Sequence, residues 1–121
     1  MHKDNRLIGR WHLLKWTARQ ADDSLLYPYG EDAVGQLWYD SMGNMMVQIM
    51  KKDRIYFTSN TFLQGTVEES LAAYSGFVAY CGAYTIDPIA KQVVHHIQIC
   101  SFPNWVGQDQ IRYFEIGRAH V

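Results

Sequence analysis

Several features that mark well-defined classes of protein are scarce or missing in this sequence. Its 121 residues include only 2 Cys and 3 Pro, which excludes a disulfide-stapled scaffold and a proline-rich linker. The longest apolar runs fall far short of the ~20 residues of a membrane-spanning helix, and the N-terminal residues lead into no apolar signal-peptide core. We therefore expect two free thiols, a reducing cytoplasmic location and no membrane partner.

The chain also lacks an excess of charge of either sign. The chain has 11 Lys+Arg against 12 Asp+Glu, a net charge of −1 with His neutral, and the only basic cluster is the short run 51–54. A broad phosphate-neutralising face is not expected, so we expect no nucleic-acid partner. The apolar fraction of 48% excludes a disordered chain, and 121 residues are enough for one domain with a core.

The familiar catalytic motifs are missing too. The sequence contains no Gly-x-Ser-x-Gly, no His-Glu-x-x-His, no phosphate-binding Gly-rich loop and no Cys-x-x-Cys. Each of these motifs marks a class of hydrolase, metalloenzyme, nucleotide-binding or redox protein. We therefore expect no metal and no cofactor, although an enzyme can lack all of these motifs.

Aromatic residues, in contrast, are abundant. The 8 Tyr, 5 Phe and 4 Trp make up 14% of the chain and favour half-buried, pleated strands. Alternation and turn residues predict strands over 9–17, 34–39, 45–50, 55–58, 77–86, 92–102 and 110–115. Short turns between them imply antiparallel pairing, and a meander of this length in a small domain closes into a barrel or packs as two sheets. We favour the barrel.

One helix is predicted. Thr66 and Glu69 form a capping-box pattern, with an apolar stripe at Val67, Leu71, Tyr74 and Val78. Gly76 is expected to end this helix in a left-handed conformation.

A family resemblance lies in motifs that extend from residue 7 to residue 115. The motifs are Leu7-Ile8-Gly9-x-Trp11-x-Leu13, Tyr27-Pro28-x-Gly30, Thr66-x-Glu68-Glu69, Tyr80-x-Gly82-x-Tyr84, Val94-His95-His96 and Phe102-Pro103-Asn104-Trp105-Val106-Gly107. Together they resemble the lipocalin-like domain proteins, which belong with the calycins. The resemblance implies an all-β, antiparallel up-and-down barrel with a central cavity and one short helix. It implies no single activity.

The C-terminus departs from this resemblance. Related chains continue with further strands, whereas residues 116–121 look like translated sequencing adapter from an environmental DNA assembly. We expect residues 1–121 to form a single domain that is C-terminally truncated, with a non-native tail at 116–121. Its unpaired sheet edges would then favour self-association into a homo-oligomer.

Candidate site residues follow from strand alternation. His95 shares a face with Val93, Ile97 and Ile99, which we expect to face the interior, whereas His96 points to the opposite face, so the two cannot readily bind one metal ion. His95 is interpreted either as a hydrogen-bonded core histidine or as an acid–base group in the cavity. The predicted ligand-binding residues are Trp38, Met50, Tyr80, Tyr84, His95 and Arg112, and the catalytic candidates are Tyr84, His95 and Arg112.

Alternatives stay open at several of these positions. Met50 and Trp38 could line an adaptable cavity or simply fill the core. Arg112 could anchor a ligand or stack on Trp11. Trp105 could plug one end of the barrel or form an exposed lid.

The two cysteines are expected not to pair. Counting back from the turn at 87–91 offsets Cys81 from Cys100 by about three residues along adjacent strands, too far for a relaxed disulfide. The sequence thus favours a binding module for a small hydrophobic or aromatic molecule. The alternative is a cofactor-independent isomerase or cyclase that acts on a hydrophobic metabolite in the same cavity.

Overall fold

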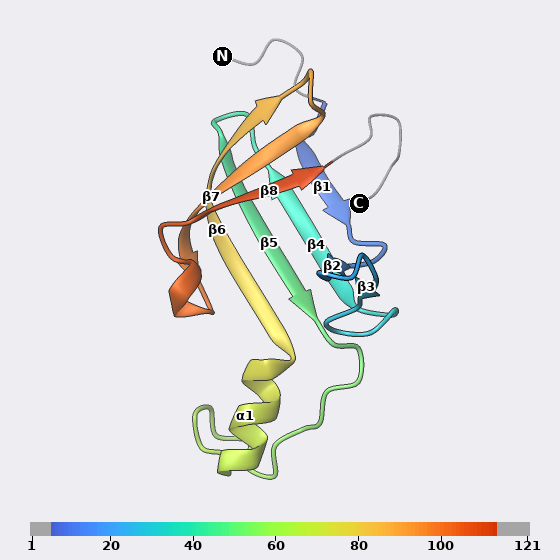
Figure 1. The fold of residues 1–121 in the computed structure, drawn as a ribbon. Helices are drawn as coiled ribbons and strands as arrows, with labels where there is room; N and C mark the ends of the chain where they lie inside the picture. The colour runs from blue at the N-terminus through green and yellow to red at the C-terminus, as the bar shows by residue number, and fades with distance from the viewer. Residues whose placement is uncertain (1–5, 114–121) are drawn as a thin grey trace.

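A computed structural model describes residues 6–113 of the chain, so the adapter-like tail expected at 116–121 lies outside the described residues. The described part is mostly β-structure (Figure 1). Its elements are β1 (Gly9–His12), β2 (Ala18–Arg19), β3 (Leu25–Leu26), β4 (Val34–Tyr39), β5 (Asn44–Met50), α1 (Val67–Ser75), β6 (Phe77–Asp87), β7 (Gln92–Cys100), the 3-10 helix η1 (Pro103–Trp105) and β8 (Asp109–Tyr113).

Six strands form one antiparallel sheet in the order β1-β4-β5-β6-β7-β8, and β2 and β3 form a separate hairpin. The all-β prediction with one short helix is therefore confirmed. Within residues 6–113 the sheet is open rather than a closed barrel, because β1 pairs only with β4 and β8 only with β7. Self-association through these two edges stays a prediction.

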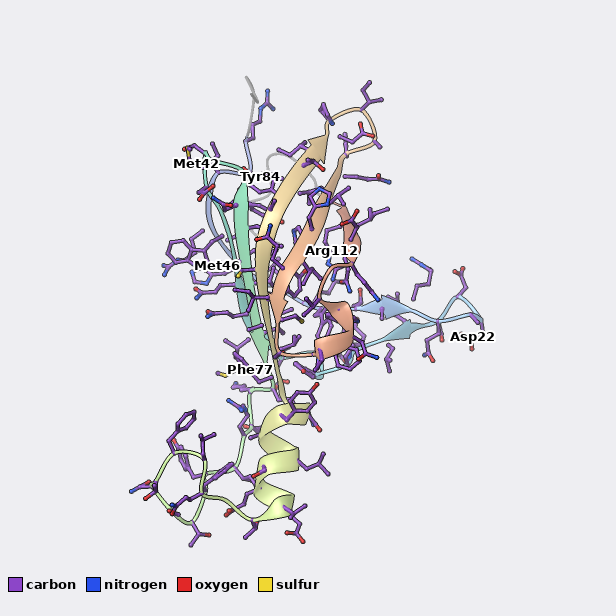
Figure 2. The ribbon with its side chains drawn as sticks, turned by 90° about the vertical axis from the view of Figure 1, so that its left-hand side faces the viewer. Asp22, Met42, Met46, Phe77, Tyr84 and Arg112 are labelled. Carbon is purple, nitrogen blue, oxygen red and sulfur yellow. The ribbon has the colours of Figure 1, made fainter. Side chains whose placement is uncertain are left out.

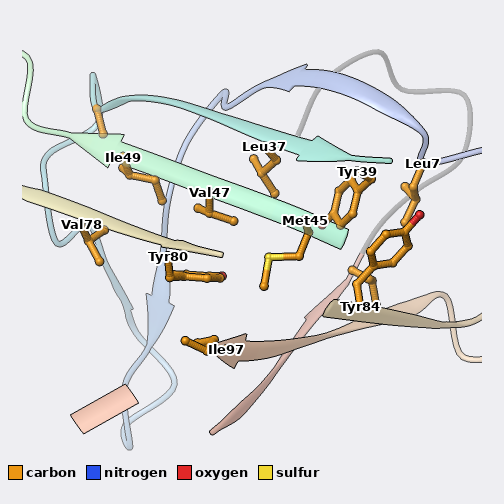
Figure 3. Packing of buried hydrophobic residues seen from close by; sticks show 12 residues of the cluster. Leu7, Leu37, Tyr39, Met45, Val47, Ile49, Val78, Tyr80, Tyr84 and Ile97 are labelled. Carbon is orange, nitrogen blue, oxygen red and sulfur yellow. The ribbon is translucent and has the colours of Figure 1, made fainter. Parts of the chain in front are cut away.

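The sheet is curled, and its core lies on the concave face. In Figure 1, β8 crosses in front of β4 and β5. Twelve hydrophobic side chains are buried there (Figure 3): Leu7, Ala33, Leu37, Tyr39, Met45, Val47, Ile49, Val78, Tyr80, Tyr84, Val93 and Ile97. Because side chains alternate along a strand, Met45, Val47 and Ile49 of β5 point inward while Met46 and Gln48 point outward.

The strands match the sequence predictions where the signals are local. The prediction over 34–39 matches β4, and the turn that follows is held by Asp40, whose carboxylate accepts the amides of Met42 and Asn44 at 2.9 and 2.8 Å. The strand predicted over 9–17 is shorter, because β1 ends at His12 and the chain leaves the sheet after Leu13. The prediction over 55–58 is wrong: this segment forms no strand.

The helix is confirmed in detail at its start but not at its end. Thr66 Oγ1 accepts the Glu69 amide at 3.1 Å and the Glu69 carboxylate accepts the Thr66 amide at 2.9 Å, which completes the capping box. Gly76 is not left-handed, since its φ is −104°. The apolar stripe is largely exposed, with Val67 at 81%. No helix of the described residues is long and apolar enough to span a membrane.

A β-bulge sets the register of β6 against β7. Cys81 pairs with Ile99 and Gly82 with Ile97, so Gln98 is the extra residue. A Cβ on Gly82 would lie 1.9 Å from the His96 carbonyl oxygen. Gly82 is therefore required by the close approach of the β7 backbone. The prediction that Ile99 faces the interior is wrong, because the extra residue reverses the alternation and leaves Ile99 69% exposed.

The same bulge changes the expected register of the two cysteines. Cys100 pairs with Tyr80, one residue from Cys81, so the offset is smaller than the predicted three residues. Both cysteines are nevertheless free, as predicted. Because Cys81 alternates with the inward Tyr80 while Cys100 lies opposite Tyr80, the two thiols point to opposite faces of the sheet.

Candidate ligand-binding site

His95 lies at the centre of the concave face and is completely buried, with 0% of its surface exposed. Its Nε2 is 2.6 Å from the hydroxyl oxygen of Tyr39 on β4, and its Nδ1 is 2.7 Å from that of Tyr80 on β6. We call these three residues the Tyr–His–Tyr cluster. Of the two interpretations of His95, the hydrogen-bonded core histidine describes this geometry.

Burial keeps the Tyr–His–Tyr cluster uncharged. Loss of solvation, with smaller contributions from the positive charges of Arg112 and His96, lowers the pKa of His95 to about 3. Burial also raises the pKa of Tyr39 and of Tyr80, and for Tyr80 the nearby Arg112 opposes this rise. Near neutral pH the cluster therefore consists of a neutral imidazole between two protonated phenols.

A pocket of about 230 Å³ opens at the helix end of the same concave face. We call it the aromatic pocket, because six of its nine lining residues carry aromatic rings. The lining residues are Trp16, Tyr29, Tyr74, Ser75, Phe77, Val78, Ser101, Phe102 and Trp105.

Three segments far apart in sequence build the aromatic pocket. The segment around β2 and β3 supplies Trp16 and Tyr29, whose rings meet edge to face with centroids 4.9 Å apart. The end of α1 and the start of β6 form a second wall. The segment after β7 supplies Phe102 and Trp105, whose rings are 5.5 Å apart. Edge-to-face rings are a favourable aromatic geometry, so each of these two pairs stabilises its own wall of the pocket.

The aromatic pocket and the Tyr–His–Tyr cluster share a wall. Val78 in the pocket and Tyr80 in the cluster are alternate inward residues of β6. The ring of Tyr80 contacts that of Trp105 with centroids 6.3 Å apart. Trp105 is partly buried and packs against the core, in line with a plug rather than an exposed lid. A ligand in the pocket would thus lie beside the cluster.

Two predicted binding residues lie elsewhere. Trp38 is 40% exposed on the outer face, where the guanidinium of Arg10 stacks over it at 5.6 Å. Met50 lies on the same face of β5 as the exposed Met46 and Gln48, because residues two apart in a strand share a face. Figure 2 shows Met46 on the opposite side of the sheet from Arg112. The prediction that both residues line the interior is therefore wrong. Its physical reason is alternation: Leu37 and Tyr39 point inward, so Trp38 between them points outward.

Tyr84 and Arg112 lie near the Tyr–His–Tyr cluster but are engaged. The Tyr84 hydroxyl donates to the Asp40 carbonyl at 2.6 Å, and its ring meets that of Tyr39 edge to face at 4.8 Å. Arg112 is partly buried and donates to the side-chain oxygen of Gln110. Trp11 instead donates its indole N–H to the Leu7 carbonyl at 2.7 Å. Among the described residues, the cation–π pairs join Arg10 to Trp38 and Arg54 to Phe77, not Arg112 to Trp11.

His96 points outward, as alternation predicts. Its Nδ1 is 2.8 Å from the Asp109 carboxylate and its Nε2 is 3.0 Å from the Thr85 hydroxyl. The order hydroxyl, imidazole and carboxylate in Thr85, His96 and Asp109 resembles a hydrolase triad. These three groups lie on the outer surface of the sheet, where the neighbouring backbone groups are paired across the ladder. No group of three His, Cys, Asp or Glu within residues 6–113 could hold a metal ion.

Sequence reasoning missed Tyr39, Trp16, Tyr29, Tyr74 and Phe77 as site residues. For Tyr39 a signal existed, because it shares a face with Leu37 in the strand predicted over 34–39. The pocket rings gave no such signal, since Trp16 and Tyr29 lie outside the strands of the main sheet. Their meeting with Trp105 depends on the path of the chain in three dimensions.

Comparison with known proteins agrees with this architecture. A family model described as a lipocalin-like domain matches residues 8–120. The chain therefore belongs to the lipocalin-like domain family, which confirms the resemblance found in the sequence. Family membership supports a small-molecule binding or carrier role in general terms, without naming a ligand.

One curated relative adds to this finding. The chain is similar to a 4'-hydroxy-3'-methoxypropiophenone carrier protein of Aspergillus oryzae, with 32% identity over 78 residues, which cover 60% of this chain and 70% of the relative. No solved structure gives a significant match.

Proposed function

We propose that this protein binds a small, single-ring aromatic molecule in the aromatic pocket. The observation that carries the proposal is the convergence of aromatic rings from three chain segments on one pocket of about 230 Å³. Pockets for drug-sized ligands run from roughly 300 to 1,000 Å³, whereas an apolar cavity of about 150 Å³ binds benzene. The size therefore favours one ring.

The named relative supports the same class of ligand. It carries an aromatic ketone with a single ring. The ring faces of the pocket offer edge-to-face and stacked contacts to such a ligand, and each contact of this kind contributes about 0.5–1.5 kcal/mol beyond burial of apolar area. We propose a carrier or binding role with a ligand of this kind.

The alternative proposal is an isomerase or cyclase with His95 as its acid–base group. Such a role needs a ring nitrogen that can exchange a proton with the ligand near neutral pH. Both ring nitrogens of His95 are engaged by tyrosine hydroxyls, and its pKa is lowered to about 3. These contacts favour the binding role over the enzyme.

Calorimetric titration with 4'-hydroxy-3'-methoxypropiophenone tests the proposal. Trp105→Leu should weaken binding by about tenfold or more, because the pocket loses a ring wall. Trp38→Leu is the matched control, since it removes the same side chain from the outer face, and should leave the affinity unchanged. Equal weakening by both variants, or no saturable binding by the wild type, would contradict the proposal.

A further inference from the structure

Ser101 differs from the other polar groups of the aromatic pocket in being fixed by the sheet. Its amide donates to the Ala79 carbonyl at 2.9 Å, and its Oγ accepts the Ala79 amide at 3.1 Å. Ser101 thus extends the pairing of β6 and β7 by one residue, with its side chain as part of the ladder. Its oxygen is held in place before any ligand arrives.

The hydroxyl proton of Ser101 takes no part in this pairing. The Ala79 amide occupies one acceptor position on Oγ, and the Ala79 carbonyl is already engaged by the Ser101 amide. Across residues 6–113, the structure gives the Ser101 hydroxyl no acceptor of its own. This hydroxyl proton is therefore available to a ligand oxygen in the pocket.

Two other polar groups of the aromatic pocket, on Ser75 and Tyr74, are held less firmly. Ser75 is exposed at the end of α1, and Tyr74 is 48% exposed. A group that is already held loses less conformational freedom on binding, so it contributes more selectivity per hydrogen bond. Ser101 and Val78 both line the pocket, and Ser101 is paired with Ala79, the residue that follows Val78 in β6.

We propose that Ser101 is the specificity-determining residue of the aromatic pocket, and that its hydroxyl donates a hydrogen bond to a carbonyl oxygen of the ligand. This inference rests on the proposed function and narrows the ligand class to aromatic carbonyl compounds. The aromatic rings hold the ring of the ligand, and Ser101 selects its carbonyl group.

A matched pair of probes isolates this hydrogen bond. The ketone 4'-hydroxy-3'-methoxypropiophenone and 2-methoxy-4-propylphenol differ only in that the second has a methylene group in place of the carbonyl. Calorimetry on the wild type should show tighter binding of the ketone, by about three- to tenfold for one neutral hydrogen bond. Ser101→Ala should abolish this preference, and Ser101→Thr, which keeps a hydroxyl, should retain it.

The comparison of the two probes also separates selectivity from stability. Ser101→Ala leaves the Ala79 amide without its partner, but this loss affects both probes alike. An equal affinity of the wild type for the two probes, or a preference that survives in Ser101→Ala, would overturn the inference while leaving the proposed function intact. Binding of neither probe to the wild type would overturn both.

A spectroscopic measurement keeps the test decisive if Ser101→Ala fails to fold. The infrared carbonyl stretch of the bound ketone should lie at lower wavenumber in the wild type than in a dry alkane solvent, because a hydrogen bond weakens the C=O bond. Ser101→Thr should show the same shift. A band at the alkane position in the wild-type complex would overturn the inference.

Discussion

Tyr39 and His95 lie 56 positions apart in the chain, yet the Tyr39 hydroxyl oxygen is 2.6 Å from His95 Nε2. They stand on β4 and β7, with β5 and β6 between them in the sheet. In a flat sheet, three strand spacings amount to roughly 14 Å, so this contact requires the sheet to curl. The bond therefore joins the two sides of the concave face that carries the candidate site.

Removal of His95 should destabilise the fold strongly. His95→Leu leaves the buried hydroxyl of Tyr39 without its His95 partner, at a cost of about 1–3 kcal/mol, and removes one interaction of the Tyr80 hydroxyl, which keeps Arg112 beside it. Urea denaturation should show this loss in the free energy of unfolding. His96→Leu is the control, because His96 and Asp109 are partly exposed, and should cost less than about 1 kcal/mol. Similar losses for the two variants would contradict the buried role of His95.

Stability should fall on mild acidification because of His95. Its pKa is lowered from 6.5 to about 3 in the folded chain, so between these values the unfolded chain binds more protons. The free energy of unfolding should therefore decrease as the pH falls below 6.5, by up to about 1.4 kcal/mol per pH unit.

The control for the pH dependence is His95→Gln, which has no titrating group at this position. Unfolding curves measured above the range in which carboxylates titrate should show a clearly shallower pH dependence for the variant. Parallel pH profiles for wild type and variant would show that His95 is charged or solvated in the folded state.

Gly82→Ala should destabilise the β6–β7 pairing. The added Cβ would lie 1.9 Å from the His96 carbonyl oxygen, and the backbone has to move, which costs about 1–3 kcal/mol. Gly76→Ala is the comparison, because φ is −104° there and the nearest atom, the Ala72 carbonyl oxygen, lies at 3.2 Å. In thermal unfolding, the melting temperature of Gly82→Ala should lie well below that of Gly76→Ala. The reverse order would count against the bulge.

Cys81 and Cys100 should not form a disulfide with each other under mild oxidation. They lie one residue out of register on adjacent strands, with thiols on opposite faces of the sheet, so a bond between them would need a rotation of the backbone. Thiol titration after unfolding should recover both groups per chain. Loss of both thiols in a monomeric product would disprove the register.

Local signals explain what the sequence could predict. The limits of β4 and the capping box of α1 follow from alternation and from Thr66 and Glu69, which act within a few residues. The inward side of Val93, His95 and Ile97 also followed from alternation. These features need no knowledge of distant chain segments.

The features that sequence analysis did not predict depend on contacts between distant segments. The outward side of Trp38 depends on which face of β4 the other strands cover, because a one-residue slip reverses every side chain. The extra residue Gln98 follows from the approach of two backbones at Gly82. The aromatic pocket arises only when Trp16, Tyr74 and Trp105 come together from separate parts of the chain.

The most direct test of the account is to locate a bound aromatic probe by nuclear magnetic resonance. Isotope-filtered nuclear Overhauser spectra of the wild-type chain with 4'-hydroxy-3'-methoxypropiophenone should connect probe protons to the methyl groups of Val78 and the ring of Trp105, and not to the outward-facing Met46. Contacts confined to outer-face residues such as Met46 and Trp38, with saturable binding, would contradict the account.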